Sequence, residues 1–584
     1  MAIPQQVACI SKSHPGKCDE SSDISVHFGI SEEEKTAVKN RGEHVLKALK
    51  RLGLDVKKGP VVSVLVSGGG LRAAIACQGV LSELSHVGLL DMVTYLAGVS
   101  GSTWCMSSLF TQSDGWKDLG KMENELRRRL QEDSWIFSVA LDQLCVAAER
   151  DDYSLTDFWS YSAVYYLTKE LLGGRLSHAR EQSEMGTVPY PIFASISKDL
   201  NSSGKEENLS EHGPDAWFEF TPDWAGYSTP GYSTPGAYVS TTQYGSKFEG
   251  GKLIQQQPER DFSYLRALWG SALADMHSIL KTIWDFFGKF IHGSSIQEEM
   301  LLADPEGVTL KITVNHLFNL VYTFLTEGDC LPTLKNLQVI MTGNKYFSEA
   351  MTLINQMIES WGQTSRDQQE QLIQSLLAKS LNEDLLKQSS VPSFLKFLWK
   401  TINCLLRWKW GTTHNFLYKY GDIEDKLLTE KKNVYLMDAG FTINSAYPLV
   451  LPPVRNTDII LSFDFSAGDP FKTIKDTEKY CKACNIPFPL VDDAKLDQEA
   501  KAPSDFYIFE GEKAPVVMHF PLFNKVNCGS EEVIKQRHKT YPTFRVTNYS
   551  DDEVRQLLED SKANVRNNKD CIFMKICELA EPTS

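Results

Sequence analysis

The sequence of 584 residues contains no long hydrophobic run and has no excess of positive charge. Its most apolar stretches are interrupted by charged residues every few positions, so none is predicted to span a membrane. The first twenty residues contain no continuous apolar stretch of the kind that forms a signal peptide. The formal net charge is −15, from 60 basic and 75 acidic residues, which argues against nucleic acid as a partner and against general attraction to anionic surfaces. We therefore expect a cytoplasmic protein whose membrane contacts, if any, are local.

Paired metal ligands are also scarce. Twelve cysteines are scattered along the chain, and only Cys481 and Cys484 form a C-x-x-C pair. No second ligand pair follows at a spacing suited to zinc. The cysteines are therefore predicted to be free thiols in a reducing compartment, and the sequence indicates no metal and no cofactor.

Signals for lipid attachment are missing as well. Position 2 is Ala2, where myristoylation requires glycine, and Cys577 lies too far from Ser584 to form a prenylation box. We therefore expect no constitutive lipid anchor.

Residues 61–104 carry the clearest pattern in the chain. An apolar β-branched run at 61–66 meets the glycines Gly68, Gly69 and Gly70, and a helical pattern follows. A second apolar run at 92–97 ends at the sequence GVSGS. A strand, a tight turn, a helix, a second strand and a second tight turn predict an α/β sheet with its chemistry at the strand ends.

Ser100 is the predicted nucleophile. The neighbouring Gly98 and Gly101 would let the backbone form a tight turn that lifts the serine oxygen above the sheet edge. Ser102 stands where the common lipase pentapeptide has its last glycine. Gly69 and Gly70 could supply backbone N–H groups that hold the negative oxygen of an acyl intermediate. Taken alone, three glycines after a strand could equally form a phosphate-binding turn.

Three motifs carry a resemblance to a known family. The segments SGGGLRA, TYLAGVSGSTW and, far downstream, MDAG resemble the cytosolic phospholipase A2 family (group IV), and matching features extend from about residue 31 to 545. Within the family the chain is most similar to the gamma type, which begins directly at the catalytic domain. The missing prenylation box departs from the gamma-type pattern.

The resemblance implies a fold and a site. It implies a patatin-like α/β domain with a mostly parallel central sheet, flanking helices and an inserted helical cap. By resemblance, Ser100 attacks the ester with Asp438 as its base, and no histidine takes part. Gly69 and Gly70 form the oxyanion hole. Arg72 and Arg455 lie where the family places arginines that support the site, and a guanidinium suits the lipid phosphate. Each could instead form a structural ion pair, the reading favoured for Arg455.

The resemblance also implies an activity. The expected reaction is hydrolysis of fatty acyl esters of glycerophospholipids, with lysophospholipase activity and acyl transfer to a lysophospholipid. Other family members carry a calcium-binding C2 domain, but only sixty residues precede the first core strand here, and they contain no acidic-loop pattern. Calcium-independent activity and peripheral association with intracellular membranes are therefore expected.

Two alternatives remain open at this point. The chain order Ser100, Asp438, His519 also matches the triad of an α/β-hydrolase, which would suit a neutral-lipid lipase, and His414 is a weaker candidate base. The protein could also be a catalytically silent lipid-binding or assembly protein of the same fold.

The domain prediction is one catalytic domain at 31–584 after a flexible segment at 1–30. Ser31 and Glu34 form a capping box that opens the first helix. A largely helical insertion at roughly 255–430 is predicted to form the cap between the serine and aspartate halves. Its aromatic stretches at 279–290 and 394–410 are either a membrane-contacting surface or helices packed on the core.

Overall fold

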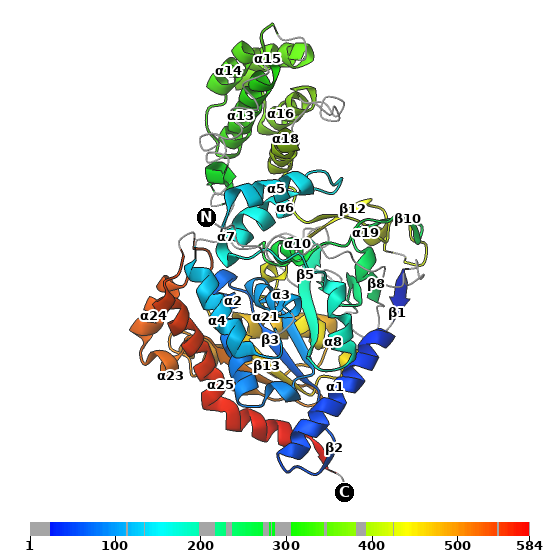
Figure 1. The fold of residues 1–584 in the computed structure, drawn as a ribbon, viewed down its shortest axis with the longest axis vertical. Helices are drawn as coiled ribbons and strands as arrows, with labels where there is room; N and C mark the ends of the chain where they lie inside the picture. Colours follow the sequence, from blue (N-terminus) through cyan, green and yellow to red (C-terminus); the bar gives the residue numbers. More distant parts are fainter. Residues whose placement is uncertain are drawn as a thin grey trace, which may run out of the picture.

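The computed structural model describes residues 24–27, 29–112, 115–132, 135–197, 217–228, 236–271, 279–281, 283–286, 305–343, 347–380, 393–423, 425–545 and 548–582. Their centre is a mixed sheet with the strand order β1-β8-β7-β6-β5-β4-β3-β13-β15-β14, and β12 joins it beside β5 (Figure 1). The strands are β1 Ser25–His27, β3 Val62–Val66, β4 Tyr95–Gly98, β5 Tyr190–Ser197, β6 Trp217–Phe220, β7 Trp224–Tyr227, β8 Gly236–Ser240, β12 Asn433–Asp438, β13 Ile459–Asp464, β14 Tyr507–Phe509 and β15 Val516–Pro521.

The middle of the sheet is parallel. Strands β5, β4, β3, β13 and β15 all run in the same direction, which confirms the α/β prediction. The antiparallel strands on both sides of this core were not predicted. One of them lies within the predicted N-terminal segment, where residues 25–27 form β1 and pair with β8. Residues 1–23 and 28 lie outside the described part of the chain.

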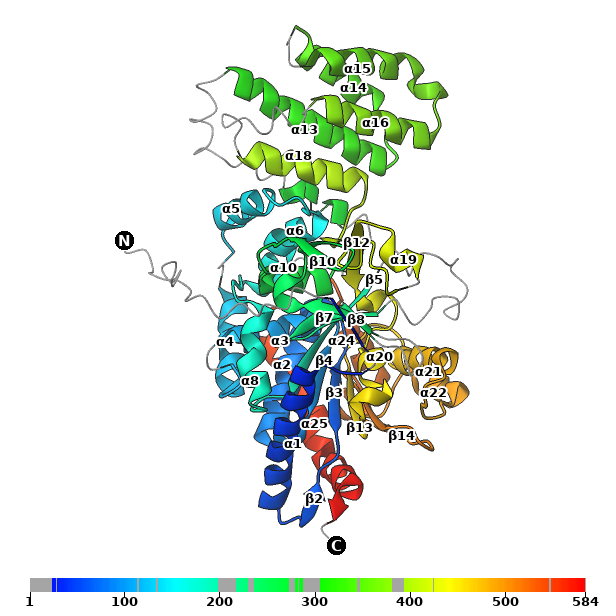
Figure 2. The same ribbon diagram turned by 90° about the vertical axis from the view of Figure 1, so that its right-hand side faces the viewer.

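Helices cover both faces of the sheet (Figure 1, Figure 2). Successive strand residues point to opposite faces: Val64 packs in one core with the helices α2 (Gly70–His86), α3 (Gly101–Thr111) and α25 (Asp551–Leu579). Leu65 packs in a second core with α20 (Tyr447–Val450) and α21 (Lys472–Cys484). Ahead of both cores, α1 (Glu32–Arg51) starts as predicted, since the Ser31 side chain accepts the Glu34 N–H. The carboxyl-terminal ends of β3 and β4 are thus fixed between two helical layers.

The closest helix–helix packing joins α2 to α25. A Cβ atom added to Gly79 of α2 would lie 2.9 Å from the Leu558 carbonyl oxygen and 2.1 Å from Ser561 Oγ. Only glycine therefore permits this approach, which places the C-terminal helix against the helix that follows the glycine turn.

Gly79→Ala should destabilise the protein by about 1–3 kcal/mol, because the backbone of α25 must move to admit the methyl group. Urea unfolding measures this loss. Gly42→Ala in α1 is the matched control: no atom lies within 4 Å of its added Cβ, and alanine is the better helix former. Equal stability of the two variants would contradict the packing argument.

The helices that stand away from the sheet cover a shorter range of residues than the cap predicted at roughly 255–430. They are α13 (Pro305–Leu325), α14 (Leu331–Met341), α15 (Ser348–Ser360), α16 (Arg366–Ser380) and α18 (Ser393–Leu406). They stack beyond α5 (Phe137–Ala147) and α6 (Leu155–Trp159), at the end of the molecule remote from the C-terminus (Figure 2). By contrast, α10 (Phe262–Trp269) packs against α3, β5 and β12 in the body.

The aromatic stretch of α18 is packed, which bears on the choice between the two readings of 394–410. Phe394, Phe397, Leu398 and Leu405 are buried, and the rings of Phe397 and Phe158 stack with centroids 6.4 Å apart. These apolar side chains pack against α5, α6 and α13, which supports the core-packing reading for the buried face of this helix.

The other aromatic stretch is described only at 279–281 and 283–286. Four of its apolar side chains are buried, Ile279, Leu280, Ile283 and Phe286, whereas Trp284 is 38% exposed. The remaining positions of 279–290 lie outside the described residues. Most of what the structure describes here is again core packing.

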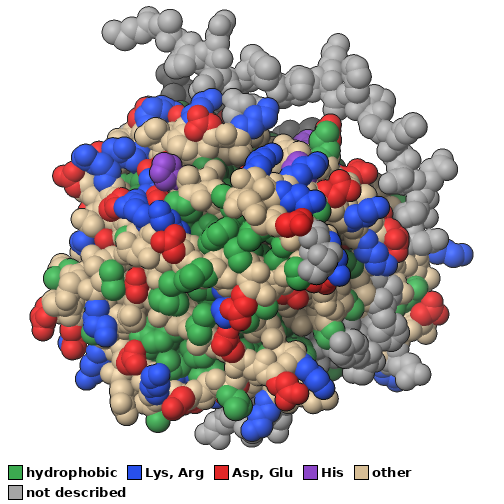
Figure 3. Space-filling view, turned by 90° about the horizontal axis from the view of Figure 1, so that it is seen from below, with side chains coloured by type: hydrophobic (Ala, Val, Ile, Leu, Met, Phe, Trp, Pro, Cys, Tyr) green, Lys and Arg blue, Asp and Glu red, His purple; other side chains and the backbone are tan. Residues whose placement is uncertain are grey.

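No helix in the described part of the chain is long and apolar enough to cross a membrane. The face remote from the stacked helices carries acidic and basic side chains side by side, with hydrophobic side chains between them (Figure 3). Because the two signs of charge alternate on this face, it has no continuous basic patch that would attract an anionic membrane surface.

Candidate active site

Ser100 occupies a tight turn between β4 and α3. It is the N-cap of α3 and has φ 53° and ψ −128°, a conformation that L-residues with a Cβ rarely adopt. Such backbone strain is typical of a nucleophile held above the end of a strand. The serine is 5% exposed, so its hydroxyl lies in a nearly water-free environment.

The glycine turn after β3 touches the serine turn directly. A Cβ atom on Gly101 would lie 1.9 Å from the carbonyl oxygen of Gly70, so the two backbones are in contact. Gly69 (φ 152°) is the N-cap of α2 and Gly70 (φ 63°) its first residue. The first N–H groups of a helix have no acceptor within the helix, and these two stand beside Ser100. The Gly68 N–H is already committed, because it donates to the Asn444 carbonyl oxygen at 3.1 Å.

Ser102 has a structural reason to differ from the common lipase pentapeptide. Its hydroxyl donates to the carbonyl oxygen of Ser67 at 2.6 Å, which ties the first turn of α3 to the end of β3. The Ser67 hydroxyl in turn accepts the Phe465 N–H at 2.6 Å. A glycine at 102 would lose this connection between the two turns.

Asp438 arrives at the site from the opposite direction. Strand β4 pairs with β5 as far as Gly98, which lies opposite Phe193. Beyond that point β12 takes over the same edge of β5 in antiparallel orientation, and Asp438 lies opposite Ser195. Since β6 occupies the other edge, β4 and β12 meet end to end. Ser100 is two residues past Gly98 and Ser195 is two residues past Phe193, so the serine and aspartate turns converge.

The Asp438 side chain is fully buried. Its Oδ1 accepts the Gly440 N–H at 2.8 Å, and its backbone N–H donates to Ser271 Oγ at 3.3 Å. These contacts fix the carboxylate at the end of β12. The turn that holds it is the Asp-Ala-Gly sequence singled out above.

Asn444 is a residue of the site that sequence reasoning missed. A Cβ atom on Gly68 would lie 2.7 Å from Ser100 Cβ and 2.3 Å from Asn444 Oδ1, and one on Gly440 would lie 2.9 Å from the same Oδ1. Asn444 therefore borders both turns. It stands six residues after Asp438 in no recognisable motif, so only the tertiary structure reveals it.

Neither candidate histidine reaches Ser100. His519 lies in β15, three strands away from β4 in the sheet order. Its Nδ1 contacts Ser462 Oγ at 3.3 Å and its Nε2 the Pro470 carbonyl oxygen at 2.7 Å, and burial lowers its pKa. His414 lies opposite Asn433, at the start of β12, whereas Asp438 is at the end. In this structure neither imidazole is placed to act as the base of Ser100.

Arg72 supports the glycine turn from inside the protein. It is fully buried, and it donates to the carbonyl oxygens of Phe465 (2.9 Å) and Tyr541 (2.5 Å). Its Nη2 has no hydrogen-bond partner among the described residues and lies 2.9 Å from a Cβ placed on Gly69. Burial lowers its pKa to about 10. Its donors are directed at backbone carbonyl oxygens beside the glycine turn, so Arg72 supports the site from within, and its contact with the lipid phosphate stays a prediction.

Arg455 lies at the wrong end of the sheet for phosphate binding. It precedes β13, on the side where the parallel strands begin, whereas Ser100 follows the end of β4. Its guanidinium bonds Glu34 at 2.8 and 3.0 Å and Glu219 at 2.8 and 3.0 Å, all buried. Burial alone would lower its pKa, but Glu219 and Glu34 raise it well above the usual value. The expected phosphate contact is therefore corrected to a structural ion pair.

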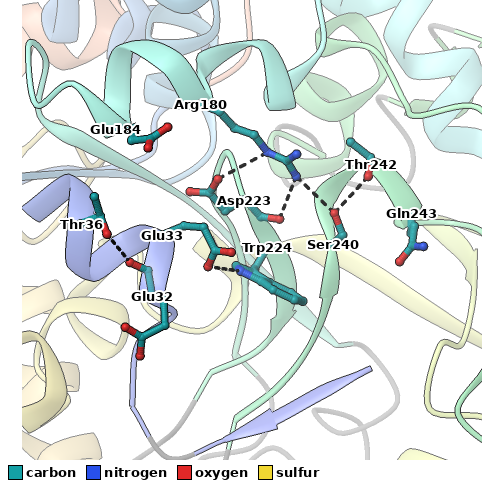
Figure 4. Close-up of a pocket in the computed structure, with 10 residues that line it drawn as sticks. All are labelled: Glu32, Glu33, Thr36, Arg180, Glu184, Asp223, Trp224, Ser240, Thr242 and Gln243. Carbon is teal, nitrogen blue, oxygen red and sulfur yellow. Dashed lines mark hydrogen bonds and ion pairs between the residues drawn. The ribbon is translucent and has the colours of Figure 1, made fainter. Parts of the chain in front are cut away.

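A cavity of about 350 Å³ also lies away from the site. It is lined by Glu33, Arg180, Asp223 and Trp224, among others, at the edge where β5 begins (Figure 4). The Trp224 indole N–H donates to Glu33 at 3.1 Å, and Arg180 pairs with Asp223 at 3.4 Å. Its surplus of carboxylates disfavours an anionic headgroup.

The described residues contain no cluster of three or more histidine, cysteine or acidic side chains that could hold an ion. Cys481 is a buried free cysteine. The site consists of a serine, a carboxylate and backbone N–H groups.

Comparisons with known proteins identify the family. Residues 62–280 match the family described as lysophospholipase catalytic domain. The chain is 43% identical to human cytosolic phospholipase A2 gamma over 96% of this chain and 97% of that protein. It is 32% identical to human cytosolic phospholipase A2 zeta over 86% of this chain and 54% of the relative.

A solved structure shares the fold. Human GIVD cytosolic phospholipase A2 superposes with a TM-score of 0.63 at 23% identity, covering 96% of this chain and 68% of the other. Similarity at that identity speaks for the fold alone, but the gamma relatives match nearly end to end. The chain belongs to the cytosolic phospholipase A2 family of enzymes.

Proposed function

We propose that this protein hydrolyses fatty acyl esters of glycerophospholipids with Ser100 as nucleophile and Asp438 as its base. The observation that carries the proposal is the end-to-end meeting of β4 and β12 along one edge of β5. It brings the buried carboxylate of Asp438 to the serine turn, while both histidines are held elsewhere. A buried carboxylate in a water-poor site is a stronger base than one in water.

The reaction then proceeds in two steps. Ser100 Oγ attacks the ester carbonyl carbon, its proton passes to Asp438, and the Gly69 and Gly70 N–H groups stabilise the oxyanion. The lysophospholipid alkoxide leaves with that proton. Water then attacks the acyl-serine and releases the fatty acid, or the hydroxyl of a lysophospholipid attacks instead and is acylated. The same site would also cleave lysophospholipids.

Calcium has no role in this mechanism, because every group it uses comes from the chain itself. Membrane contact follows from the substrate, which is presented in lipid surfaces. The buried face of α18 does not supply that contact. Single exposed apolar side chains on neighbouring elements, such as Val146 (67% exposed) and Val339 (74%), remain available for it.

The test is Ser100→Ala assayed on phosphatidylcholine vesicles with and without a calcium chelator. We expect hydrolysis by the unaltered protein to persist with the chelator. Ser100→Ala should lower the rate by at least about 10³-fold, because the acyl-enzyme can no longer form. Covalent labelling by a fluorophosphonate should disappear in the same variant. Labelling retained in Ser100→Ala would refute Ser100 as the nucleophile. No hydrolysis by the unaltered protein would refute the proposed activity and favour a lipid-binding role.

A further inference from the structure

Asn444 bonds both backbone polar groups of Gly68 in the glycine turn. Its backbone carbonyl oxygen accepts the Gly68 N–H at 3.1 Å, and its Nδ2 donates to the Gly68 carbonyl oxygen at 3.1 Å. A residue 376 positions later in the chain therefore fixes the position and orientation of Gly68. Gly69 and Gly70 come next in the chain, so the position of their peptide groups depends on that of Gly68.

The same side chain reaches a third segment. Asn444 Nδ2 also donates to Ser466 Oγ at 2.7 Å, just after β13. There the Ser466 N–H donates to Asp464 Oδ1 at 2.7 Å. Phe465 lies between them, and its carbonyl oxygen accepts from Arg72. The ends of β3, β12 and β13 are thus joined at one amide.

Asn444 also lies on the short segment that begins with Asp438. Its Oδ1 and Asp438 Oδ1 lie 2.9 and 3.0 Å from the same point, a Cβ placed on Gly440. One residue therefore contacts the turn that would hold the oxyanion and borders the carboxylate that would take the serine proton. These two groups come from distant parts of the chain, and Asn444 connects them through the N–H and carbonyl groups of Gly68.

We infer that Asn444 is a positioning residue of the reaction: its amide sets the oxyanion turn at a fixed distance from Asp438. Loss of the amide donor would leave both groups present but let the glycine turn move relative to the base. Misplacement of about 1 Å in such a site costs on the order of 10²-fold in rate. The inference rests on the proposed Ser100–Asp438 function.

The experiment compares Asn444→Asp, Asn444→Ala and Ser466→Ala. The first keeps the shape but removes both Nδ2 donors, the second removes the whole amide, and the third removes one acceptor. Asn485→Asp is the matched control. It introduces the same charge at an exposed, left-handed cap residue of α21. Each purified variant is assayed for kcat and KM on phosphatidylcholine vesicles, for the rate of fluorophosphonate labelling and for its melting temperature.

We expect both Asn444 variants to lower kcat and the labelling rate together, by roughly 10- to 100-fold. KM should stay within about threefold and melting temperature within about 3 °C. Ser466→Ala should give a smaller loss of kcat, and Asn485→Asp none. Ser466→Ala keeps the test decisive if an Asn444 variant does not fold, since an unchanged kcat in Ser466→Ala would then overturn the inference.

Three results would overturn the inference. One is an unchanged kcat in either folded Asn444 variant. Another is a loss confined to Asn444→Asp, which would report charge rather than position. The third is a loss that follows melting temperature in every variant. Failure of the proposed function gives a different result. Ser100→Ala would then keep its fluorophosphonate labelling, and the inference would fall together with that function.

Discussion

Asp438→Asn should lower the hydrolysis rate by on the order of 10²–10⁴-fold, whereas His519→Asn should leave it within about threefold. A general base contributes an effect of this size, and asparagine keeps the shape of the side chain without its proton affinity. His519 lies three strands from β4, with both ring nitrogens directed at Ser462 and Pro470. The measurement is kcat/KM on phospholipid vesicles.

The melting temperature of both variants is the control for folding. The Gly440 N–H that now donates to Asp438 Oδ1 can donate to the asparagine carbonyl oxygen instead. Asp438→Asn should therefore remain folded. A folded His519→Asn that loses as much activity as Asp438→Asn would restore the triad and contradict the dyad.

Arg455→Met should destabilise the protein by about 3–5 kcal/mol, because it leaves Glu34 and Glu219 as two unpaired buried carboxylates. Urea unfolding measures the loss. Adding Glu34→Gln and Glu219→Gln to the same chain should recover part of it, since the buried charges are then removed.

Lys426→Met supplies the comparison for that prediction. Its ion pair with Glu430 is exposed, with side-chain exposures of 81% and 67%, and such pairs are worth about 0–1 kcal/mol. If Arg455 bound the lipid phosphate, Arg455→Met would instead raise KM with little change in stability. That outcome would overturn the assignment of Arg455 to the fold.

Local pattern predicted the elements that follow from short-range chemistry. The apolar runs at 61–66 and 92–97 became β3 and β4, Ser31 capped α1 by accepting the Glu34 N–H, and the glycine-flanked Ser100 took the strained turn. The Glu34 carboxylate bonds Arg455 and does not close the predicted capping box. The strands, the cap and the turn each depend on residues within a few positions of one another. The prediction of α/β architecture followed from their alternation along the chain.

The local sequence pattern could not predict what an apolar face or a charged side chain contacts in the folded protein. The apolar face of α18 could meet a membrane or another helix with the same sequence, and the neighbouring α5, α6 and α13 decided it. Arg72 and Arg455 looked alike as cations near the site. One supports a turn from within, and the other neutralises Glu34 and Glu219 at the far end of the sheet.

The sequence by itself predicted a nucleophile, its turn and the glycines beside it, and it identified the family. These predictions depend on backbone freedom and on motifs that are contiguous in the chain. The meeting of the Asp438 segment with the serine turn depends on the tertiary structure, because β12 meets β4 only through their shared partner β5. The tertiary structure also brought Asn444 to Gly68, since contacts between residues hundreds of positions apart are set by strand pairing and packing.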